Sequence, residues 1–443
     1  MRPVILALCL SACSLDVRDL DAFRETARGP EKLSALVHDS SRPSALRAEA
    51  ALRLLDLERP ELDGRTLLLD ALKALSEPER AALVPTLEHG LTERMETPAN
   101  VAPNARAVRA KDVAVRLLPM FPPPQRAELG AAVVRWIGVD VDRRADVGEF
   151  SLEQVTAQVG AASAAPSADS LRTDLQLKSL ARLTDNVLRY GDTATRARAA
   201  AKLVDVERAY RGQPDKRAAL DSYALPSLGQ LVDTDAARQR LVAIACDAQL
   251  EFGEREKAFD LLVGHVGEAD VPALAQVALD DSAPFSLRTR ALARLGETRS
   301  PDALKPLVTL VGARNRSLRE PAFGYALEVG GERAVSDLIA ALPQYWNVSY
   351  AKDEIEGYSE QLAKLPPTTY LVTTLGRKMY AYFWWQRVLG IRYVARRASV
   401  VEAKWRLKLH EGDTKEITGD GWPGGWNIAR EVALGLAQVD KRS

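Results

Sequence analysis

The sequence predicts an all-α fold, a right-handed α-α superhelical solenoid of stacked helix pairs that ends in an aromatic-rich C-terminal cap. The first observation behind this prediction is an internal repeat of about 30 to 33 residues, a period typical of stacked helix pairs. The repeat is clearest in three consecutive segments that begin at Glu256, Leu287 and Leu318. Their alignment gives two apolar columns, which hold Ala258, Ala291 and Ala322 in one helix and Leu274, Leu304 and Val335 in the next.

The second observation is the pattern inside each repeat. In the middle copy, Leu287, Ala291 and Leu295 recur at helical spacing, and the run Gly-Glu-Thr-Arg-Ser-Pro then interrupts the helix. Pro301 falls in the first turn of the following helix, where a proline sacrifices no hydrogen bond. Small alanines in the first column let paired helices approach closely. Because one pair cannot cover its own apolar stripe, each pair is expected to need neighbours on both sides.

These segments resemble HEAT repeats, including the variety found in phycobilin-lyase-type HEAT proteins. Two motifs carry the resemblance: the Arg-x-x-Ala-x-x-x-Leu-Gly run from Arg288 to Gly296, and the Asp-Ala-Leu-x-x-Leu run from Asp302. The resemblance implies an open solenoid, which grows by adding pairs and so accommodates 443 residues without a single central core. It names neither a partner nor a reaction.

The expected organisation starts with a tether and a first helix over residues 13–41, followed by the HEAT-like solenoid over residues 42–342. The first helix pair of this solenoid is predicted over 42–58 and 65–75, joined by a Pro- and Gly-containing connection. Ser76 is then a candidate N-cap for the next helix, with a proline in the first turn.

The middle of the chain is less regular. Residues 161–170 read AASAAPSADS, and this small, polar composition favours a flexible insertion. Long helical patterns follow over 171–190 and 194–210, before the clear repeats begin.

The last hundred residues, 343–443, are predicted to form an aromatic-rich cap with a terminal HEAT-like repeat. Fourteen of the chain's 26 aromatic residues lie between Tyr345 and Trp426. Residues 368–375 are rich in β-branched side chains, so helix and strand both remain open there. The terminal repeat is expected to use two apolar stripes, Val388, Ile391 and Ala395 followed by Val400, Ala403 and Leu407. A last helical run matches the Arg-x-x-Ala start of the repeat at Arg430 and Ala433.

The N-terminus reads MRPVILALCLSACSLD and predicts an export signal over residues 1–12. Leu10-Ser11-Ala12-Cys13 resembles the bacterial lipobox, which implies cleavage before Cys13 and acylation of its thiol. Cys9 is the poorer candidate because Leu8 precedes it. Ser14 after the cysteine favours the outer membrane, on its periplasmic side, with acyl chains as the membrane anchor. The alternative is a hydrophobic start on a cytoplasmic scaffold, and whether Met1 is the true start stays open.

No catalytic or metal-binding motif is found in the sequence. The four histidines, His38, His89, His265 and His410, fall in separate repeats without ligand spacing. Lys plus Arg and Asp plus Glu number 60 each, so no bulk positive charge favours nucleic acid. Cys246 lies in an apolar helical run and is expected to be a small buried residue. We therefore expect no enzyme activity, no cofactor and no metal.

One surface is a candidate for partner binding. Aromatic and basic residues share one helical stretch of the cap, and rigid aromatics beside arginine are typical of binding hot spots. The candidate residues are Trp384, Trp385, Arg392, Tyr393 and Arg396. The alternative is that the rings fill the interior of the cap and the arginines are solvated. The predicted function is an exported, lipid-anchored scaffold that binds a protein or peptide. The alternatives are a HEAT-lyase-like enzyme or small-ligand binder that uses the C-terminal aromatic and arginine pocket, and a cytoplasmic scaffold.

Overall fold

The computed structural model describes residues 15–57, 61–96, 105–140, 148–343, 351–418 and 421–442. Over these residues the chain is built from helices, and the only β-type pairing is an isolated bridge between Glu416 and Asn427. The predicted all-α class is confirmed. The chain divides into two compact units, residues 1–236 and 237–443. Among the described residues, no helix has the length and apolar character needed to cross a membrane.

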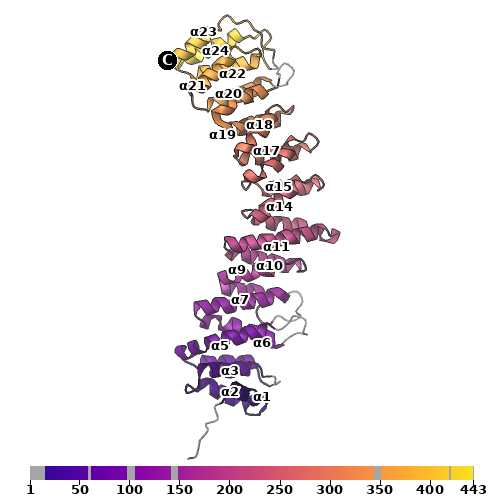
Figure 1. Cartoon of the computed structure of the whole chain (residues 1–443), viewed down its shortest axis with the longest axis vertical. Helices are drawn as coiled ribbons and strands as arrows, with labels where there is room; N and C mark the ends of the chain where they lie inside the picture. The colour runs from indigo at the N-terminus through magenta and orange to yellow at the C-terminus, as the bar shows by residue number, and fades with distance from the viewer. Residues whose placement is uncertain are drawn as a thin grey trace, which may run out of the picture. The chain divides into compact units, whose positions relative to one another are not determined.

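In unit 1, successive helices lie one against the next, as the indigo-to-magenta part of Figure 1 shows. Its helices are α1 (Val17–Glu25), α2 (Gly29–His38), α3 (Ser44–Leu55), α4 (Gly64–Lys73), α5 (Glu77–Met95), α6 (Ala105–Leu117), α7 (Pro123–Asp140), α8 (Leu152–Val159), α9 (Ala164–Ser170), α10 (Leu177–Tyr190), α11 (Thr193–Arg211), α12 (Arg217–Ala219) and α13 (Leu225–Gln230). Short 3-10 or π turns extend some of them, namely η1 (Leu118–Met120), η2 (Gly160–Ser163), η3 (Pro214–Lys216) and η4 (Leu220–Ala224).

Unit 2 contains the clear repeats and the cap, and helix α14 begins at the boundary between the units. Its helices are α14 (Asp235–Cys246), α15 (Phe252–Leu261), α16 (Val271–Leu279), α17 (Phe285–Glu297), α18 (Leu304–Val311), α19 (Arg316–Ala341), α20 (Ala351–Ala363), α21 (Thr369–Lys378), α22 (Trp384–Arg397), α23 (Val400–Lys408) and α24 (Ile428–Asp440). Two 3-10 turns, η5 (Glu268–Asp270) and η6 (Pro301–Ala303), precede α16 and α18. Helix α19 is two helices joined at Gly331, whose φ of 56° breaks the helical path where the repeat predicts a break.

The repeat predicted from the sequence is the packing unit of the structure. Ala258, Ala291 and Ala322 lie on α15, α17 and α19 and are fully buried, and each of these helices packs against the next. In the second column, Leu274 and Val335 are fully buried and Leu304 is half-buried. A larger side chain in the alanine column would separate neighbouring first helices, so the close spacing depends on alanine.

The arginine of the Arg-x-x-Ala motif has a structural role that the sequence did not reveal. Arg288 Nε donates to the carbonyl of Ala278, 3.2 Å away, and Ala278 is the penultimate residue of α16. Arg255 repeats this contact with Ala245 of α14 at 3.1 Å, and Arg47 repeats it with Val37 of α2 at 2.9 Å. The last carbonyls of a helix have no partner within the helix, and a cation there also suits the helix dipole. Each of these three arginines therefore caps the helix that precedes its own, whereas Arg319 of the third copy donates to the loop carbonyls of Ala313 and Arg314.

Two predictions about irregular segments were wrong. The expected tether before the first helix is itself helix α1, which starts with a capping box between Asp16 and Asp19 and buries Leu20. The expected flexible insertion at 161–170 forms η2 and α9, which pack against α7, α10 and α11. Small side chains let this helix lie close to its neighbours, and Asn186 donates to the hydroxyls of Ser163 and Ser167 at 2.9 and 2.8 Å. Small, polar composition marks close packing here.

The described residues of the cap form helices α20 to α24 and the segments that connect them. Residues 368–375, left open between helix and strand, form the start of α21 behind the N-cap Thr368. The two predicted stripes of the terminal repeat are confirmed, because Val388, Ile391, Ala395, Ala403 and Leu407 are fully buried and Val400 is half-buried. Ala433, which matches the motif alanine in the sequence, is exposed, and α24 instead buries Glu431, Val432, Gly435 and Val439.

Candidate functional site

The aromatic residues predicted to bind a partner lie in the interior of the cap. Trp384 and Trp385 are 4% and 1% exposed, and Tyr393 is fully buried. They project from α22, which packs against α20, α21 and α24. The two tryptophan rings meet edge to face, 5.8 Å apart. These three side chains do not form a surface that a partner reaches, so the alternative interpretation, that the rings fill the cap, describes them.

The two predicted arginines lie elsewhere on α22. Arg392 Nε donates to Glu431 at 3.1 Å, and its guanidinium lies 5.2 Å from the ring centre of Trp422. Arg396 is half-buried, and together with Arg392 and carboxylates of Glu356, Glu360 and Glu431 it lines a hollow of about 300 Å³. Trp384, Trp385 and Tyr393 do not line this hollow. The predicted site is thus not assembled as one surface. Cys13, the predicted lipid attachment site, lies outside the described residues.

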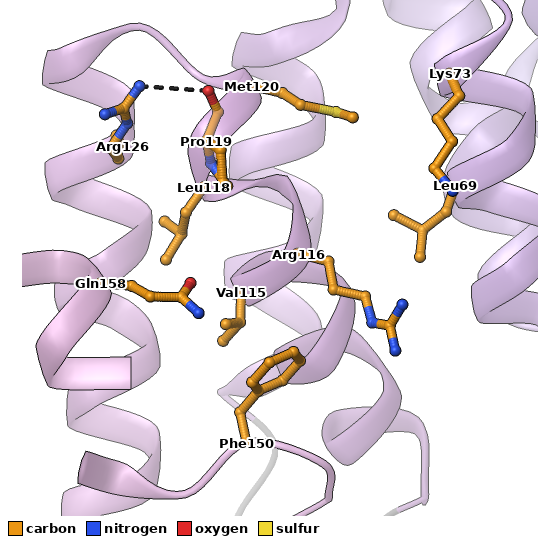
Figure 2. Close-up of a pocket in the computed structure, with 10 residues that line it drawn as sticks. All are labelled: Leu69, Lys73, Val115, Arg116, Leu118, Pro119, Met120, Arg126, Phe150 and Gln158. Atoms are coloured by element: carbon orange, nitrogen blue, oxygen red, sulfur yellow. Dashed lines mark hydrogen bonds between the residues drawn. The ribbon is translucent and has the colours of Figure 1, made fainter. Parts of the chain in front are cut away.

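A groove in unit 1 is the stronger candidate. It has a volume of about 470 Å³ and crosses three successive second helices of the stack, α4, α6 with its extension η1, and α8 (Figure 2). Helix α4 contributes Leu69 and Lys73 from one side. The opposite side is built from α6 with η1, the start of α7, the loop before α8 and α8 itself, which contribute Val115, Arg116, Leu118, Pro119, Met120, Arg126, Phe150 and Gln158.

The floor of this groove is apolar. Val115 and Leu118 are buried in the stack, and Leu69 is 6% exposed. Met120 stands at the edge, 38% exposed, and Figure 2 shows its side chain reaching toward Leu69. Pro119 is the second residue of the turn η1, which follows the end of α6 and presents this methionine at the surface. Phe150 also lines the groove, and a flexible methionine such as Met120 adapts to an apolar ligand side chain.

The polar rim of the groove is basic. Lys73, Arg116 and Arg126 are exposed, and the described lining residues include no carboxylate. Arg116 forms a bidentate contact with Glu149, and this arginine lowers the pKa of the Glu149 carboxyl. Both side chains are nearly half exposed, 47% and 46%, so the pair is weak and a ligand carboxylate can replace Glu149. Arg126 donates to the carbonyls of Pro119 and Phe121, and no described carboxylate pairs with it.

A buried ion pair holds the wall that carries Phe150. Lys111 and Asp112 are fully buried on α6 and lie 2.5 Å apart. Lys111 Nζ donates to the carbonyl of Phe150 at 2.9 Å, and the amide of Glu149 donates to both oxygens of Asp112 at 3.1 Å. Gly148 has a φ of 77°, and a Cβ there would lie 2.6 Å from the Asp112 carboxylate. The chain before α8 is therefore clamped onto α6, which fixes the position of Phe150.

This groove was not predicted from the sequence. Its lining comes from five separate elements, and each residue type is unremarkable where it stands in the sequence. One signal was available, because the charged dipeptide Lys111-Asp112 interrupts the apolar pattern of α6 where the stack buries it. A buried charged pair needs hydrogen-bond partners, and here these partners are the backbone of the groove wall.

No group of three or more His, Cys, Asp or Glu side chains among the described residues is placed to hold a metal ion. Burial raises the pKa of the Cys246 thiol to about 11, which makes it a poor nucleophile at neutral pH. The arrangement at the groove suits binding of a segment that carries an apolar side chain next to a carboxylate.

No family model matches the sequence, and no curated protein does. Among solved structures, the chain is similar to human deoxyhypusine hydroxylase in complex with glycerol, with 16% identity over 70% of this chain and 98% of the hydroxylase and a TM-score of 0.23. It is similar to a homology model of the full-length AP-3 complex (10% identity, 97% and 85% covered, TM-score 0.38) and to importin beta (11%, 95% and 64%, TM-score 0.27). These TM-scores are all below 0.5, and no function is inferred from these neighbours.

Proposed function

We propose that this chain is a non-catalytic scaffold that binds a segment of a protein partner in the unit 1 groove, and that it is exported and anchored to the membrane by acyl chains on Cys13. One observation carries the binding proposal. The groove, of about 470 Å³, has an apolar floor and a rim of three exposed basic side chains, and its described lining includes no carboxylate. The segment that fits has an apolar side chain for the floor and a carboxylate for Arg116 or Arg126.

The construction of the groove supports this role. Its wall is held by the buried Lys111–Asp112 pair, so the site is formed before a ligand arrives and little ordering free energy is lost on binding. Its rim arginines bind carboxylates in a planar, bidentate manner, which gives orientation as well as attraction. A stacked-pair fold offers such surfaces across several repeats at once.

The binding proposal is tested with a photo-crosslinking amino acid at Met120, which is exposed at the groove edge. The partner peptide joined to this position is identified by mass spectrometry, and a synthetic copy is titrated against the purified chain. We expect the Arg116→Glu/Arg126→Glu variant to bind this peptide at least about tenfold more weakly, as expected for loss of charge-assisted contacts. The matched control is Lys202→Glu/Arg208→Glu, which makes the same change in net charge at exposed positions outside the groove. Equal binding by both variants would refute the proposal.

The export proposal rests on the sequence LSAC at residues 10–13 and on its resemblance to the lipobox. In this mechanism the membrane affinity comes from acyl chains attached at one residue, and each buried methylene contributes about 0.8 kcal/mol. Mass spectrometry of the mature N-terminus distinguishes the alternatives. A diacylated Cys13 as the first residue supports an envelope lipoprotein, whereas an intact Met1 would support a cytoplasmic scaffold.

A further inference from the structure

The outward side of α23 exposes three large apolar side chains in a row. Val401, Trp405 and Leu409 follow one another at i, i+4 and i+8, and they are 81%, 60% and 56% exposed. On the opposite side of the helix, Ala403 and Leu407 are fully buried where α23 packs against α22 and α24. We call Val401, Trp405 and Leu409 the outer stripe. Among the described residues, no other helix has extensive contact with α23, so the outer stripe has no cover.

A fourth exposed apolar side chain, Tyr380, lies near the end of α23. Its ring lies 4.4 Å from the ring of His410, the residue that follows Leu409, and Tyr380 is 60% exposed whereas His410 is buried. Contiguous exposed apolar surface of this kind is uncommon on a monomer and marks an interaction site, whereas single exposed apolar residues do not.

The two edges of the outer stripe differ in charge, because one carries lysines and the other carries an ion pair. Lys404 and Lys408 follow Val401 and Trp405 at i+3, so they form one edge of the same face. Lys404 forms an ion pair with Asp440, with 2.8 Å between its Nζ and the carboxylate oxygen. Lys408 is exposed, and no described carboxylate pairs with it. On the other edge, the charge of Glu402 is neutralised by Arg406, whose Nε lies 3.0 Å from the carboxylate. The surroundings of the stripe on α23 are therefore net positive.

We propose that the outer stripe is the docking site for an amphipathic helix of a protein partner, one with apolar side chains at i, i+4 spacing and carboxylates along one edge. The spacing on α23 points to a helix, because two helices bury such stripes against each other by interlocking their side chains. Within unit 2, second helices of neighbouring pairs contact one another, as α16 contacts α18. The lysine edge selects a partner whose facing edge is acidic.

A second copy of this chain is disfavoured as the occupant by the same charges. In antiparallel pairing of two α23 helices, equivalent edges face each other, so Lys404 and Lys408 of one copy would meet the same lysines of the other. Like charges at such positions oppose association. An acidic helix meets the lysines with opposite charge and covers the same apolar surface.

The test uses the purified full chain and fluorescein-labelled stapled helical peptides of about 14 residues, long enough to match the stripe. The peptides share leucines at i, i+4 and i+8 and carry glutamate, glutamine or lysine at the flanking positions. Fluorescence anisotropy is expected to show the tightest binding for the glutamate peptide, with affinity that falls as salt is added. Trp405→Ala is expected to weaken this binding at least about tenfold, as for a central aromatic anchor. Lys408→Glu is expected to weaken binding of the glutamate peptide and to strengthen binding of the lysine peptide.

The matched control is Leu434→Gln on α24. Leu434 is 56% exposed, as Leu409 is, but it lies outside the stripe and lines the hollow beside Arg396. Leu409→Gln is expected to weaken peptide binding and Leu434→Gln to leave it unchanged, with circular dichroism verifying that both variants fold. The Arg116→Glu/Arg126→Glu groove variant is expected to bind the peptide normally, which separates this proposal from the proposed function.

Three results would overturn the proposal. The glutamate peptide could fail to bind, or bind Trp405→Ala as well as the unchanged chain. Analytical ultracentrifugation could instead reveal self-association that Trp405→Ala abolishes, which would assign the stripe to a second copy. Vesicles of phosphatidylglycerol and phosphatidylcholine could bind the unacylated chain in a Trp405-dependent way while no peptide does, which would assign it to a lipid surface.

Discussion

Replacing Arg288 with methionine tests the capping role of the Arg-x-x-Ala motif. Methionine keeps an unbranched apolar stem against the neighbouring helices but removes the guanidinium that caps α16. Arg288 Nε lies 3.2 Å from the carbonyl of Ala278, and its side chain is only 13% exposed. A hydrogen bond from a charged donor contributes about 1.5 to 3 kcal/mol. The second contact, to Asp281, contributes less, because that carboxylate is 92% exposed. We expect a local loss of about 2 kcal/mol.

Hydrogen exchange measured by mass spectrometry is the suitable assay, because a stack of helix pairs need not unfold in one step. A loss of about 2 kcal/mol raises the exchange rates of protected amides in α16 and α17 by about 30-fold. Arg290→Met is the matched control on the same helix. Arg290 is 34% exposed and contacts the carboxylates of Glu256 and Asp260 at 2.8 and 3.0 Å, so its loss is expected to change exchange by less than about fivefold. Equal effects of the two variants would refute the capping role.

Three further predictions concern the groove wall and the cap. Asp112→Ala removes the buried carboxylate that contacts Lys111 and is expected to destabilise unit 1 by about 3 to 5 kcal/mol. Exchange of α6 amides at the same rate as in the parent would contradict this. Gly148→Ala places a Cβ 2.6 Å from the Asp112 carboxylate at a residue with positive φ, and it is expected to lower the urea concentration at the unfolding midpoint. The control Gly253→Ala, at an open helical position, is expected to raise that midpoint slightly. Burial lowers the pKa of His410 below its ordinary value of 6.5, so the unfolded chain takes up the proton more readily than the folded chain. The free energy of unfolding therefore falls as the pH drops through 6.5, and a His410→Gln variant is expected to lose this pH dependence between about pH 7 and 5.5.

The fold was predictable because its information is local and repeated. The spacing of Ala258, Ala291 and Ala322 required one small buried residue per repeat, and the structure buries all three. Pro and Gly at fixed places in the repeat gave the breaks, including the kink at Gly331. The errors came where composition was read without packing. Residues 161–170 are small and polar, and that composition serves equally for a flexible loop and for a helix held closely against three others.

The candidate site was not predictable from the same local patterns. Trp384 and Trp385 were candidates for a binding surface because aromatics beside arginines are frequent at interfaces, and the alternative was that the rings fill the end of the stack. Their 4% and 1% exposure decides between these two possibilities, and it depends on contacts with α20, α21 and α24 that no spacing along α22 reveals. The groove in unit 1 was missed for a related reason, because its five elements meet only after the stack has formed.

The outer stripe lies where the residues depart from what packing alone requires. On α18, the outward positions Lys305 and Thr309 are polar, as a solvated helix face needs. On α23, positions with the same i, i+4 spacing hold Val401 and Trp405, although the inward side of that helix is already satisfied by Ala403 and Leu407. Packing within the stack thus explains the inward apolar residues, but it does not explain why the outward residues of α23 are apolar. An exposed indole leaves apolar area in contact with water, and a partner helix that covers it gains about 25 cal/mol for each Å² removed from water. In a repeat fold, where most side chains serve the neighbouring pair, such unused apolar residues are the physical criterion for locating partner surfaces.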